Sequence, residues 1–228
     1  MKRIDTIIFD FDGTLVKLKI NFRLIRSKIL KLMKKYGINL DRHRVFILEL
    51  IDFGFDELKK QGIEKADRFK KEALDIVKKI ELESAKKAEV INGVDTVISN
   101  LRMLGIKIGI VTRNGRKAVK HAISRLNLDY DTLTTRDDVK FVKPHPYHLH
   151  FTLKRLNSDS KYSIMVGDHP MDVIAGRRAG MKTIGVLSGD STIEDFSIIK
   201  PDLILNSVKE LKKVIHPEWN NWILKAKN

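Results

Sequence analysis

Residues 4–15 read IDTIIFDFDGTL, an apolar run that ends at two aspartates and a Gly-Thr pair. The run Ile4–Asp10 has the length and the β-branched and aromatic content of a buried strand. Two later runs have the same form, Ile106–Thr112 (IKIGIVT) and Tyr162–Asp168 (YSIMVGD). We therefore predict three strands that each end abruptly in polar residues.

Further strand patterns lie at Lys182–Leu187 and Pro201–Leu205, with a weaker one at Tyr130–Thr134. Helical patterns lie between the strands. In Val94–Leu104 the apolar residues recur on one face, and Gly105 follows as a C-cap. Strands that alternate with helices indicate a parallel sheet covered on both faces. The sequence therefore predicts an α/β fold with a Rossmann-like parallel sheet.

Residues 17–88 break this alternation, because they contain no convincing strand pattern. Apolar residues recur there at helical spacing in three stripes: Phe22, Ile25, Ile29, Leu32 and Tyr36; Val45, Leu48 and Ile51; and Phe69, Ala73, Ile76, Val77 and Ile80. We predict an all-α insert placed directly after the first strand. The predicted domains are a core of residues 1–16 and 89–228 and a helical domain of residues 17–88.

The composition excludes several kinds of site. The 228 residues include no cysteine, so disulfides, cysteine zinc sites and thiol nucleophiles are ruled out, and any metal must bind oxygen or imidazole. No apolar run approaches the roughly 20 residues of a membrane span. Asp5, Asp10 and Asp12 interrupt the N-terminal stretch where a signal peptide needs apolar residues. We expect a cytoplasmic protein with no membrane partner.

The formal net charge of +15 is concentrated in the insert, where residues 17–88 carry 20 basic and 11 acidic side chains. Such a charge is typical of nucleic-acid binding, of attraction for a small anionic substrate, or of a solvated Lys/Glu-rich surface. The basic side chains of residues 16–40 alternate with apolar residues expected to face the core, whereas a nucleic-acid surface would expose stacking aromatics. We do not expect a nucleic-acid partner, and a nucleic-acid-binding protein on this scaffold stays the alternative from another class.

Ligands of an open parallel sheet bind beyond the carboxyl ends of its strands. The three best strand patterns end in Asp10, Thr112 and Asp168, so these polar groups are expected at one edge of the sheet. Taken singly, each has a simpler interpretation as the start of a turn or a helix cap. Their coincidence at three strand ends favours a functional site.

The stretch FDFDGTL, residues 9–15, resembles the DxDGT signature of the haloacid dehalogenase-like superfamily, a group dominated by metal-dependent phosphatases. The strand end at Thr112 is similar to the second motif of that superfamily, and Lys143 in VKP to the third. GDHPMD, residues 167–172, is similar to the GDxxxD fourth motif. The resemblance covers residues 4–187 and implies a catalytic core with a helical cap, of the phosphoglycolate phosphatase-like kind.

The resemblance implies chemical roles for the motif residues. Asp10 would be the nucleophile that forms an aspartyl-phosphate. Asp12, two residues further along an extended strand and so on the same face, would protonate the leaving oxygen and deprotonate the attacking water. Mg²⁺ is the expected cofactor, because it neutralises a carboxylate and a phosphate that otherwise repel each other. Its implied ligands are Asp10, the backbone carbonyl of Asp12, and Asp168.

Thr112, Arg113 and Asn114 offer donors suited to nonbridging phosphate oxygens, and Lys143 supplies a positive charge near the nucleophile. Asp172 has two open interpretations. It could hold a metal-bound water or orient Lys143, or it is an acid favoured by the dipole of a helix's first turn.

The cluster of His145, His148 and His150 contains an H-x-x-H spacing that can bind zinc. No fixed third ligand is apparent, and Mg²⁺ already accounts for the site. We therefore expect no zinc site. Trp219 and Trp222 are expected to pack on the core or on a partner subunit.

In the resembled superfamily, an insert at this position is a cap that closes over the catalytic edge, excludes water and contributes specificity. Lys19, Arg23 and Arg26 lie nearest the start of the insert. They could reach a carboxylate or a second phosphate of the substrate, and the alternative is a plain solvated face.

The sequence thus predicts an Mg²⁺-dependent phosphatase that acts on small anionic phosphorylated metabolites, as a monomer or a homodimer. A sugar-phosphate mutase of the same superfamily is the alternative within the enzyme class. The substrate stays open, because residues 15–19, LVKLK, depart from the Asp-Ser or Asp-Thr pair that continues the first motif in many relatives.

Overall fold

The computed structural model describes residues 4–39 and 45–214. The chain divides into two compact units, Met1–Leu18 with Ala88–Asn228, and Lys19–Lys87. The first unit is an α/β structure, and the described elements of the second are all helices. The predicted fold class, a parallel-sheet core with a helical insertion, is confirmed.

The units divide one or two residues inside the predicted limits of the insert, residues 17–88. That the first unit is catalytic and the second a cap stays a prediction. Trp219 and Trp222 lie outside the described residues, so their predicted packing also stays a prediction.

Six parallel strands form the sheet of the first unit, in the order β5-β4-β1-β6-β7-β8. They are β1 (Thr6–Phe9), β4 (Lys107–Val111), β5 (Thr132–Thr134), β6 (Ser163–Gly167), β7 (Lys182–Val186) and β8 (Leu203–Leu205). All six strand patterns of the sequence are present, each shorter than its pattern because the residues at the ends lie beyond the paired ladder. β1 lies in the middle, between β4 and β6.

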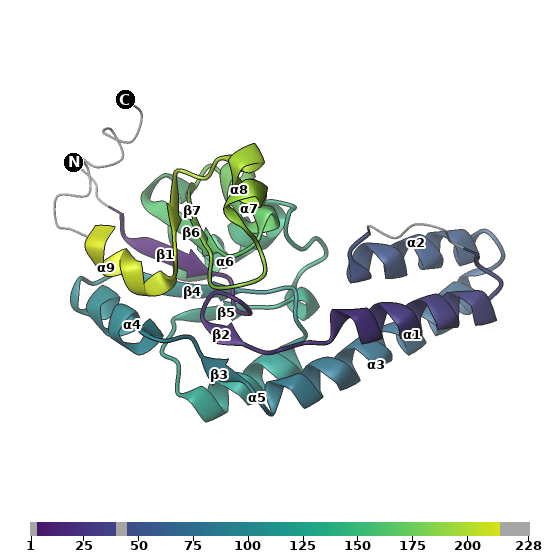
Figure 1. The fold of residues 1–228 in the computed structure, drawn as a ribbon. Coiled ribbons are helices and arrows are strands. Elements are labelled where there is room, and N and C mark those ends of the chain that lie inside the picture. Colours follow the sequence, from purple (N-terminus) through teal and green to yellow (C-terminus); the bar gives the residue numbers. More distant parts are fainter. Residues whose placement is uncertain (1–3, 40–44, 215–228) are drawn as a thin grey trace. The chain divides into compact units, whose positions relative to one another are not determined.

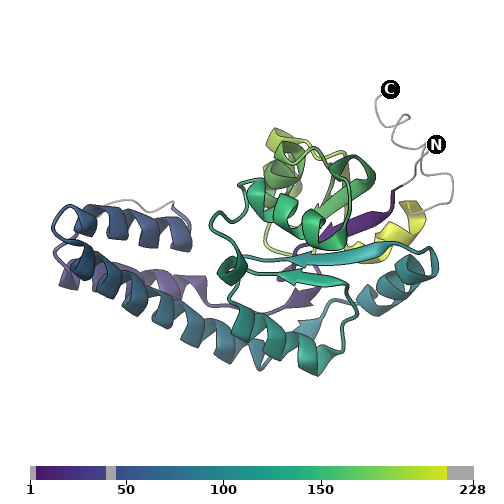
Figure 2. The ribbon, with the colours of Figure 1, turned by 180° about the vertical axis from the view of Figure 1, so that it is seen from behind.

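Helices cover both faces of this sheet, as Figures 1 and 2 show. The helices α4 (Val94–Met103) and α5 (Arg116–Leu126) lie on one face, and α6 (Tyr147–Leu156) and α7 (Pro170–Arg178) lie on the other. Apolar residues of α6 and α7 pack with residues of β1, β4 and β6 in one buried cluster: Ile8, Val111, Leu149, Leu153, Leu156, Met165, Ala175, Ala179 and Met181. This packing fixes the strands whose ends carry the predicted site.

Short elements complete the first unit. They are the 3-10 helices η1 (Arg136–Asp138), η2 (Ser160–Tyr162) and η3 (Val208–Glu210), and the helices α8 (Ile193–Ile199) and α9 (Leu211–Val214). Two short strands, β2 (Val16–Lys17) and β3 (Glu89–Val90), pair antiparallel where the chain leaves and re-enters this unit. Sequence patterns missed this pair, because two residues are too few to show the alternation of a strand.

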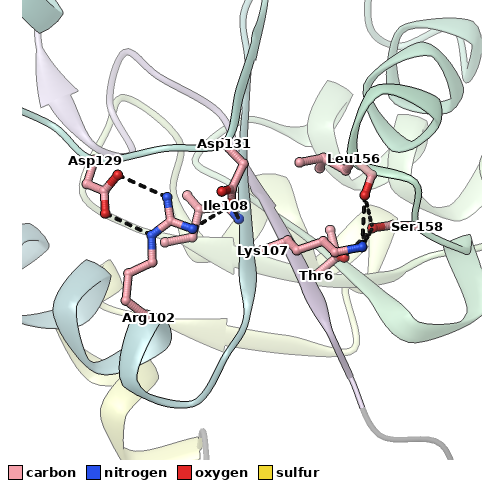
Figure 3. Close-up of polar contacts among 8 residues, drawn as sticks. All are labelled: Thr6, Arg102, Lys107, Ile108, Asp129, Asp131, Leu156 and Ser158. Atoms are coloured by element: carbon pink, nitrogen blue, oxygen red, sulfur yellow. Dashed lines mark hydrogen bonds and ion pairs between the residues drawn. The ribbon is translucent and has the colours of Figure 1, made fainter.

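Polar contacts join neighbouring segments at the amino ends of the strands, away from the carboxyl ends that carry the predicted site (Figure 3). Arg102 of α4 donates from Nε and Nη2 to Asp129 at 2.8 and 3.0 Å, and from Nη1 to Asp131 at 2.6 Å. Lys107 Nζ donates to the carbonyl of Leu156, at the C-terminal end of α6, at 2.9 Å, where a positive charge is favourable. These contacts stabilise the fold away from the predicted site.

The second unit consists of α1 (Phe22–Lys35), α2 (Ile47–Lys59) and α3 (Ile63–Ala85). The three helices share one buried core: Ile25, Ile29, Leu32, Met33, Ile38, Leu50, Ile51, Leu58, Ala66, Phe69, Ala73 and Val77. The three predicted stripes thus contribute to a common core. Phe22, which the first stripe placed on the core face, is 49% exposed, because it is the first residue of α1, one turn before Ile25.

Gly54 of α2 allows the close approach of α3. A Cβ atom at Gly54 would lie 2.6 Å from both Cε1 and Cζ of the Phe69 ring, closer than side-chain atoms normally approach. Phe69 is itself fully buried, and the ring of Tyr36 packs edge-on against it with centroids 5.4 Å apart. The ring therefore has little room to move.

We predict that Gly54→Ala lowers the free energy of unfolding by about 1–3 kcal/mol, because overpacking outweighs the roughly 1 kcal/mol that alanine gains over glycine in a helix. Urea denaturation followed by circular dichroism measures the change. The matched control is Lys59→Ala, an exposed position on the same helix, which should be neutral within about 0.5 kcal/mol. A stabilised Gly54→Ala variant would contradict the close packing.

Candidate active site

The carboxyl ends of β1, β4 and β6 bring three predicted site residues to one edge of the sheet. Asp10 follows β1, and its backbone N–H donates to the carbonyl of Val166 in β6 at 2.8 Å. Thr112 follows β4 and Asp168 follows β6. Because β6 lies directly beside β1, Asp168 is placed next to Asp10.

Three carboxylates gather at this edge. Asp10, Asp168 and Asp172 each offer one oxygen, and these oxygens lie within 4.8 Å of one another. Their side chains are withdrawn from water: that of Asp10 is 13% exposed and that of Asp172 is 2% exposed. Among the residues that the structure describes, this is the group of three or more side chains suited to hold a metal ion.

The ammonium group of Lys143 lies between two of these carboxylates. Its Nζ is 2.6 Å from Oδ1 of Asp10 and 2.6 Å from Oδ1 of Asp172, and it donates to the carbonyl of Val111 at 3.2 Å. The side chain is 1% exposed. Burial disfavours the charge of Lys143, but the Asp10 and Asp172 carboxylates outweigh it, so the pKa of Lys143 lies above its ordinary value. Lys143 is therefore a buried cation beside the predicted nucleophile.

The site still holds more negative than positive charge. Burial raises the pKa of Asp10 to about 6, although Lys143 opposes the rise, and the charge of Asp172 adds to it. Burial also raises the pKa of Asp168 to about 9, with the charges of Asp10 and Asp172 adding to the rise. Three carboxylates around one ammonium thus repel one another.

These residues fit a divalent cation such as Mg²⁺. Hard cations bind carboxylate oxygens, and a second positive charge would offset both the burial and the repulsion by Asp10 and Asp172 that raise the pKa of Asp168. Asp10, Asp168 and Asp172 are the side chains that would hold the ion. The predicted contribution of the Asp12 backbone carbonyl stays a prediction.

Two loops enclose the carboxylate of Asp168. Thr14 Oγ1 donates to Asp168 Oδ1 at 3.2 Å. A Cβ atom at either Gly13 or Gly189 would collide with the Asp168 carboxylate, so both loops need glycine there. Ser188 Oγ donates to the carbonyl of Gly13 at 2.7 Å and ties the loops together. Sequence reasoning missed the loop after β7, whose signal was a Ser-Gly pair directly after a strand pattern.

Asp172 combines the two interpretations that the sequence left open. Its Oδ1 pairs with Lys143, while its Oδ2 accepts from the backbone N–H of His169 at 3.1 Å. His169 Nδ1 in turn accepts from the N–H of Met171 at 3.1 Å, which completes a capping box at the start of α7. A Cβ atom at Gly167 would collide with Asp172, so glycine is needed there as well. The helix cap thus aims Asp172 at Lys143.

Asp12 lies beyond the end of β1 and forms an isolated bridge with Val16, so it does not continue that strand. β1 ends at Phe9, and the chain then turns, with the N–H of Val16 donating to the carbonyl of Phe11 at 3.0 Å. Asp12 Oδ1 accepts from the backbone N–H of Leu18 at 2.8 Å. This contact ties the Asp12 carboxylate to the backbone that follows the turn. Its role as acid and base stays a prediction.

The turn after β4 carries the predicted phosphate donors. Thr112 Oγ1 accepts from the backbone N–H of Asn114 at 3.1 Å. Arg113 Nη1 lies 3.5 Å from Sδ of Met171, so its guanidinium reaches toward the start of α7. Asn114 is 8% exposed, and its Nδ2 has no hydrogen-bond partner among the described residues. Contact of these residues with phosphate stays a prediction.

The predicted substrate residues of the insert lie in the second unit. Arg26 Nη2 donates to the backbone carbonyl of Val45, which links the start of α1 to the residues before α2. Lys19 and Arg23 are exposed. The structure thus gives Arg26 a contact within its own unit, and contact of the three residues with substrate stays a prediction.

His148 contacts the backbone of Lys143, and no pattern in the sequence indicated this contact. It is fully buried, and its Nδ1 accepts from the backbone N–H of Lys143 at 3.4 Å. His145 is instead exposed and stacks on Phe141 with ring centroids 4.8 Å apart. Burial lowers the pKa of His148 to about 3, and the charge of Lys143 adds to the fall. His148 is therefore neutral in the folded protein.

This burial predicts a pH dependence of stability. The unfolded chain protonates His148 below about pH 6.5, whereas the folded chain does so only near pH 3, so stability is full above pH 6.5 and falls as the pH drops toward 3. From pH 7 to pH 5, the free energy of unfolding of the wild type should fall by about 2 kcal/mol because of this residue. His148→Gln should not show this part of the fall. Urea denaturation at both pH values measures the difference.

The control for this prediction is His150→Gln, at an exposed position of the same helix, which should lose stability as the wild type does. An unchanged pH dependence in His148→Gln would contradict a neutral, buried imidazole.

The carboxylate cluster predicts metal binding that depends on Asp168. Asp168→Asn should weaken Mg²⁺ binding by at least about tenfold, because it removes a charged ligand. Isothermal titration calorimetry measures the affinity, and Asp95→Asn, an exposed position of α4, serves as the control. Equal affinity in wild type and Asp168→Asn would rule out this cluster as the metal site.

Comparisons with known proteins agree with this geometry. The family described as haloacid dehalogenase-like hydrolase matches residues 7–186. The pyrophosphatase PpaX of Bacillus cereus is 32% identical over 221 residues, which cover 93% of this chain and 97% of the relative.

Solved structures show the same fold. A predicted phosphoglycolate phosphatase from Haemophilus somnus is similar with a TM-score of 0.66 at 20% identity, over 95% of this chain and 100% of the other. The β-phosphoglucomutase of Clostridium difficile is similar with a TM-score of 0.67 at 20% identity, over 97% of this chain and 99% of the other. Together with the family match over most of the chain, these findings confirm the resemblance drawn from the four motifs. The chain belongs to the haloacid dehalogenase-like hydrolase family.

Proposed function

We propose that the protein is an Mg²⁺-dependent phosphatase that hydrolyses small anionic phosphorylated metabolites through an aspartyl-phosphate on Asp10. The observation that carries this proposal is the buried cluster of Asp10, Asp168 and Asp172 around the ammonium of Lys143. Paired and repelling carboxylates at the carboxyl edge of a parallel sheet suit a metal-assisted reaction of an anion.

The first half of the reaction transfers the phosphoryl group to the protein. An oxygen of the Asp10 carboxylate attacks phosphorus, a P–O bond to Asp10 forms, and the P–O bond to the leaving group breaks. The leaving oxygen takes the electron pair and a proton from the carboxyl group of Asp12. Lys143 holds Oδ1 of Asp10 and so fixes the direction of attack.

The second half releases phosphate. Asp12, now a carboxylate, takes a proton from a water molecule whose oxygen attacks phosphorus, and the P–O bond to Asp10 breaks. The products are inorganic phosphate and the free Asp10 carboxylate. Bound Mg²⁺ would neutralise the carboxylates and polarise the phosphoryl group throughout. Thr112, Arg113 and Asn114 would donate to the nonbridging oxygens.

The reactions of the relatives indicate which substrates to test first. The name of the Bacillus cereus relative makes pyrophosphate the first candidate, and a small polyanion agrees with the positive charge of the chain. The mutase alternative shares the fold, since the β-phosphoglucomutase structure is similar at 20% identity. Phosphate release and isomer formation, measured on one sample of a sugar phosphate, separate the two activities.

Loss of the nucleophile should abolish turnover. With p-nitrophenyl phosphate, Asp10→Asn should lower kcat by at least about 1,000-fold, because the amide cannot form the phosphoenzyme. Asp12→Asn should be similarly damaging, since both half-reactions lose their proton transfer. The exposed Asp95→Asn is the control. Substantial turnover in Asp10→Asn would refute the assignment of the nucleophile.

Metal removal tests the cofactor separately. EDTA should abolish phosphate release from p-nitrophenyl phosphate and from pyrophosphate, and added Mg²⁺ should restore it. Turnover that persists in EDTA would overturn the metal dependence while leaving the nucleophile untouched.

A further inference from the structure

Arg136, the first residue of η1 after β5, contacts the turn after β4. The Arg136 side chain is 6% exposed, and its Nη1 donates to the backbone carbonyl of Arg113 at 2.9 Å. The strands are also joined at this point, because the N–H of Thr112 donates to the carbonyl of Thr134 at 3.0 Å. A buried guanidinium thus lies against the backbone of the predicted phosphate-binding turn.

Hydrogen bonds hold the backbone around Arg136 in place. Arg136 begins η1, where the backbone N–H and Oγ1 of Thr135 both donate to Asp138 Oδ2 at 2.7 Å. Asp137 Oδ2 accepts from the N–H of Arg116 at 2.8 Å, which ties η1 to the start of α5. Both sides of η1 are therefore anchored, and the backbone from which the Arg136 side chain extends is fixed by these contacts.

The peptide unit between Arg113 and Asn114 connects Arg136 to Thr112, because Arg136 contacts its C=O and Thr112 contacts its N–H. The unit is trans, so its C=O and N–H point in opposite directions. With the carbonyl held by Arg136, the N–H of Asn114 points the other way and donates to Thr112 Oγ1 at 3.1 Å. A charged donor on the carbonyl also polarises the amide and strengthens this second hydrogen bond.

This arrangement affects the orientation of the Thr112 hydroxyl. A hydroxyl has one hydrogen to donate and two lone pairs to accept with. Because the N–H of Asn114 occupies a lone pair, the hydroxyl hydrogen of Thr112 remains available for an acceptor beyond the turn. Arg136 thereby selects the rotation of the Thr112 hydroxyl without touching a ligand.

We propose that Arg136 is a positioning residue for phosphoryl transfer, acting through the Arg113–Asn114 peptide on the hydroxyl of Thr112. The proposal rests on the proposed function, in which Thr112 donates to the phosphoryl group. Its alternative is a purely structural Arg136 that joins β4 to β5 and affects every property of the site alike.

A double-mutant cycle between Arg136 and Thr112 distinguishes these roles. The variants are Arg136→Met, Thr112→Val and the pair, assayed for kcat and KM with p-nitrophenyl phosphate, for inhibition by orthovanadate and for Mg²⁺ affinity. The control is Arg155→Met. Arg155 Nε donates to Thr132 Oγ1 at 2.9 Å, at the amino end of β5, whereas Arg136 follows the carboxyl end of this strand.

Arg136→Met should lower kcat about tenfold and weaken orthovanadate inhibition by a similar factor, less than the loss of a direct donor. Mg²⁺ affinity should stay within about twofold, because the carboxylates are untouched. In the Thr112→Val background, Arg136→Met should change kcat by less than about twofold. Arg136→Lys, which keeps a charged donor, should retain more activity than Arg136→Met, and Arg155→Met should match the wild type.

Additive losses in the cycle, or a parallel fall in Mg²⁺ affinity, would overturn the positioning role. If circular dichroism shows that Arg136→Met is unfolded, the cycle is completed with Arg136→Lys and judged by the same criterion of additivity. A wild type that neither turns over p-nitrophenyl phosphate or pyrophosphate nor binds orthovanadate with Mg²⁺ would overturn the proposed function and this inference together. An active wild type with an additive cycle would overturn the inference alone.

Discussion

The ammonium of Lys143, held 2.6 Å from both Asp10 and Asp172, is the contact on which the arrangement of the site depends. Removing a partner from such a buried ion pair leaves an uncompensated charge in the interior, which costs about 3–5 kcal/mol. The contact therefore joins three separate stretches of chain: the end of β1, the segment before α6 and the first turn of α7. Each stretch is also fixed by its own backbone, through the pairing of Asp10 with β6, the imidazole of His148 and the capping box of His169. One ammonium does not balance three carboxylates, and the remaining negative charge defines the place of a cation.

Much of this arrangement is predictable, because strand ends are visible in the sequence. Apolar runs that stop at Asp10, Thr112 and Asp168 place those residues at one edge of any parallel sheet. The adjacency of β1 and β6 is not predictable in this way, because composition and periodicity do not encode strand order. Strand alternation does not extend to Asp12 with certainty of register, because β1 ends at Phe9 and a turn follows Asp12, in which Gly13 has a φ of +84°.

Other parts of the site could not be predicted, because they are properties of contacts between distant segments. His148 resembles a surface histidine of a basic, polar stretch until α6 places it under the backbone of Lys143. Arg136 and the two aspartates after it have the pattern of a solvated charge run, and only the pairing of β4 with β5 brings the guanidinium against the carbonyl of Arg113. The Ser-Gly pair at Gly189 indicates only a turn after a strand, and the reason for glycine there is the close approach of the Asp168 carboxylate.

The positive charges near the site lie in two layers: an inner one, Lys143 among the carboxylates, and an outer one, Arg136 against the backbone. Lys143 contacts carboxylates directly and decides which of their oxygens are occupied. Arg136 donates to the backbone carbonyl of Arg113, and its charge reaches Thr112 through the dipole of that peptide. This difference matters for stability as well, because the inner layer keeps like charges close together in the folded chain and separates them on unfolding. A cation that binds only the folded chain would therefore stabilise it by mass action. The outer layer contains no such repulsion, so its contribution to the fold does not depend on whether the ion is bound.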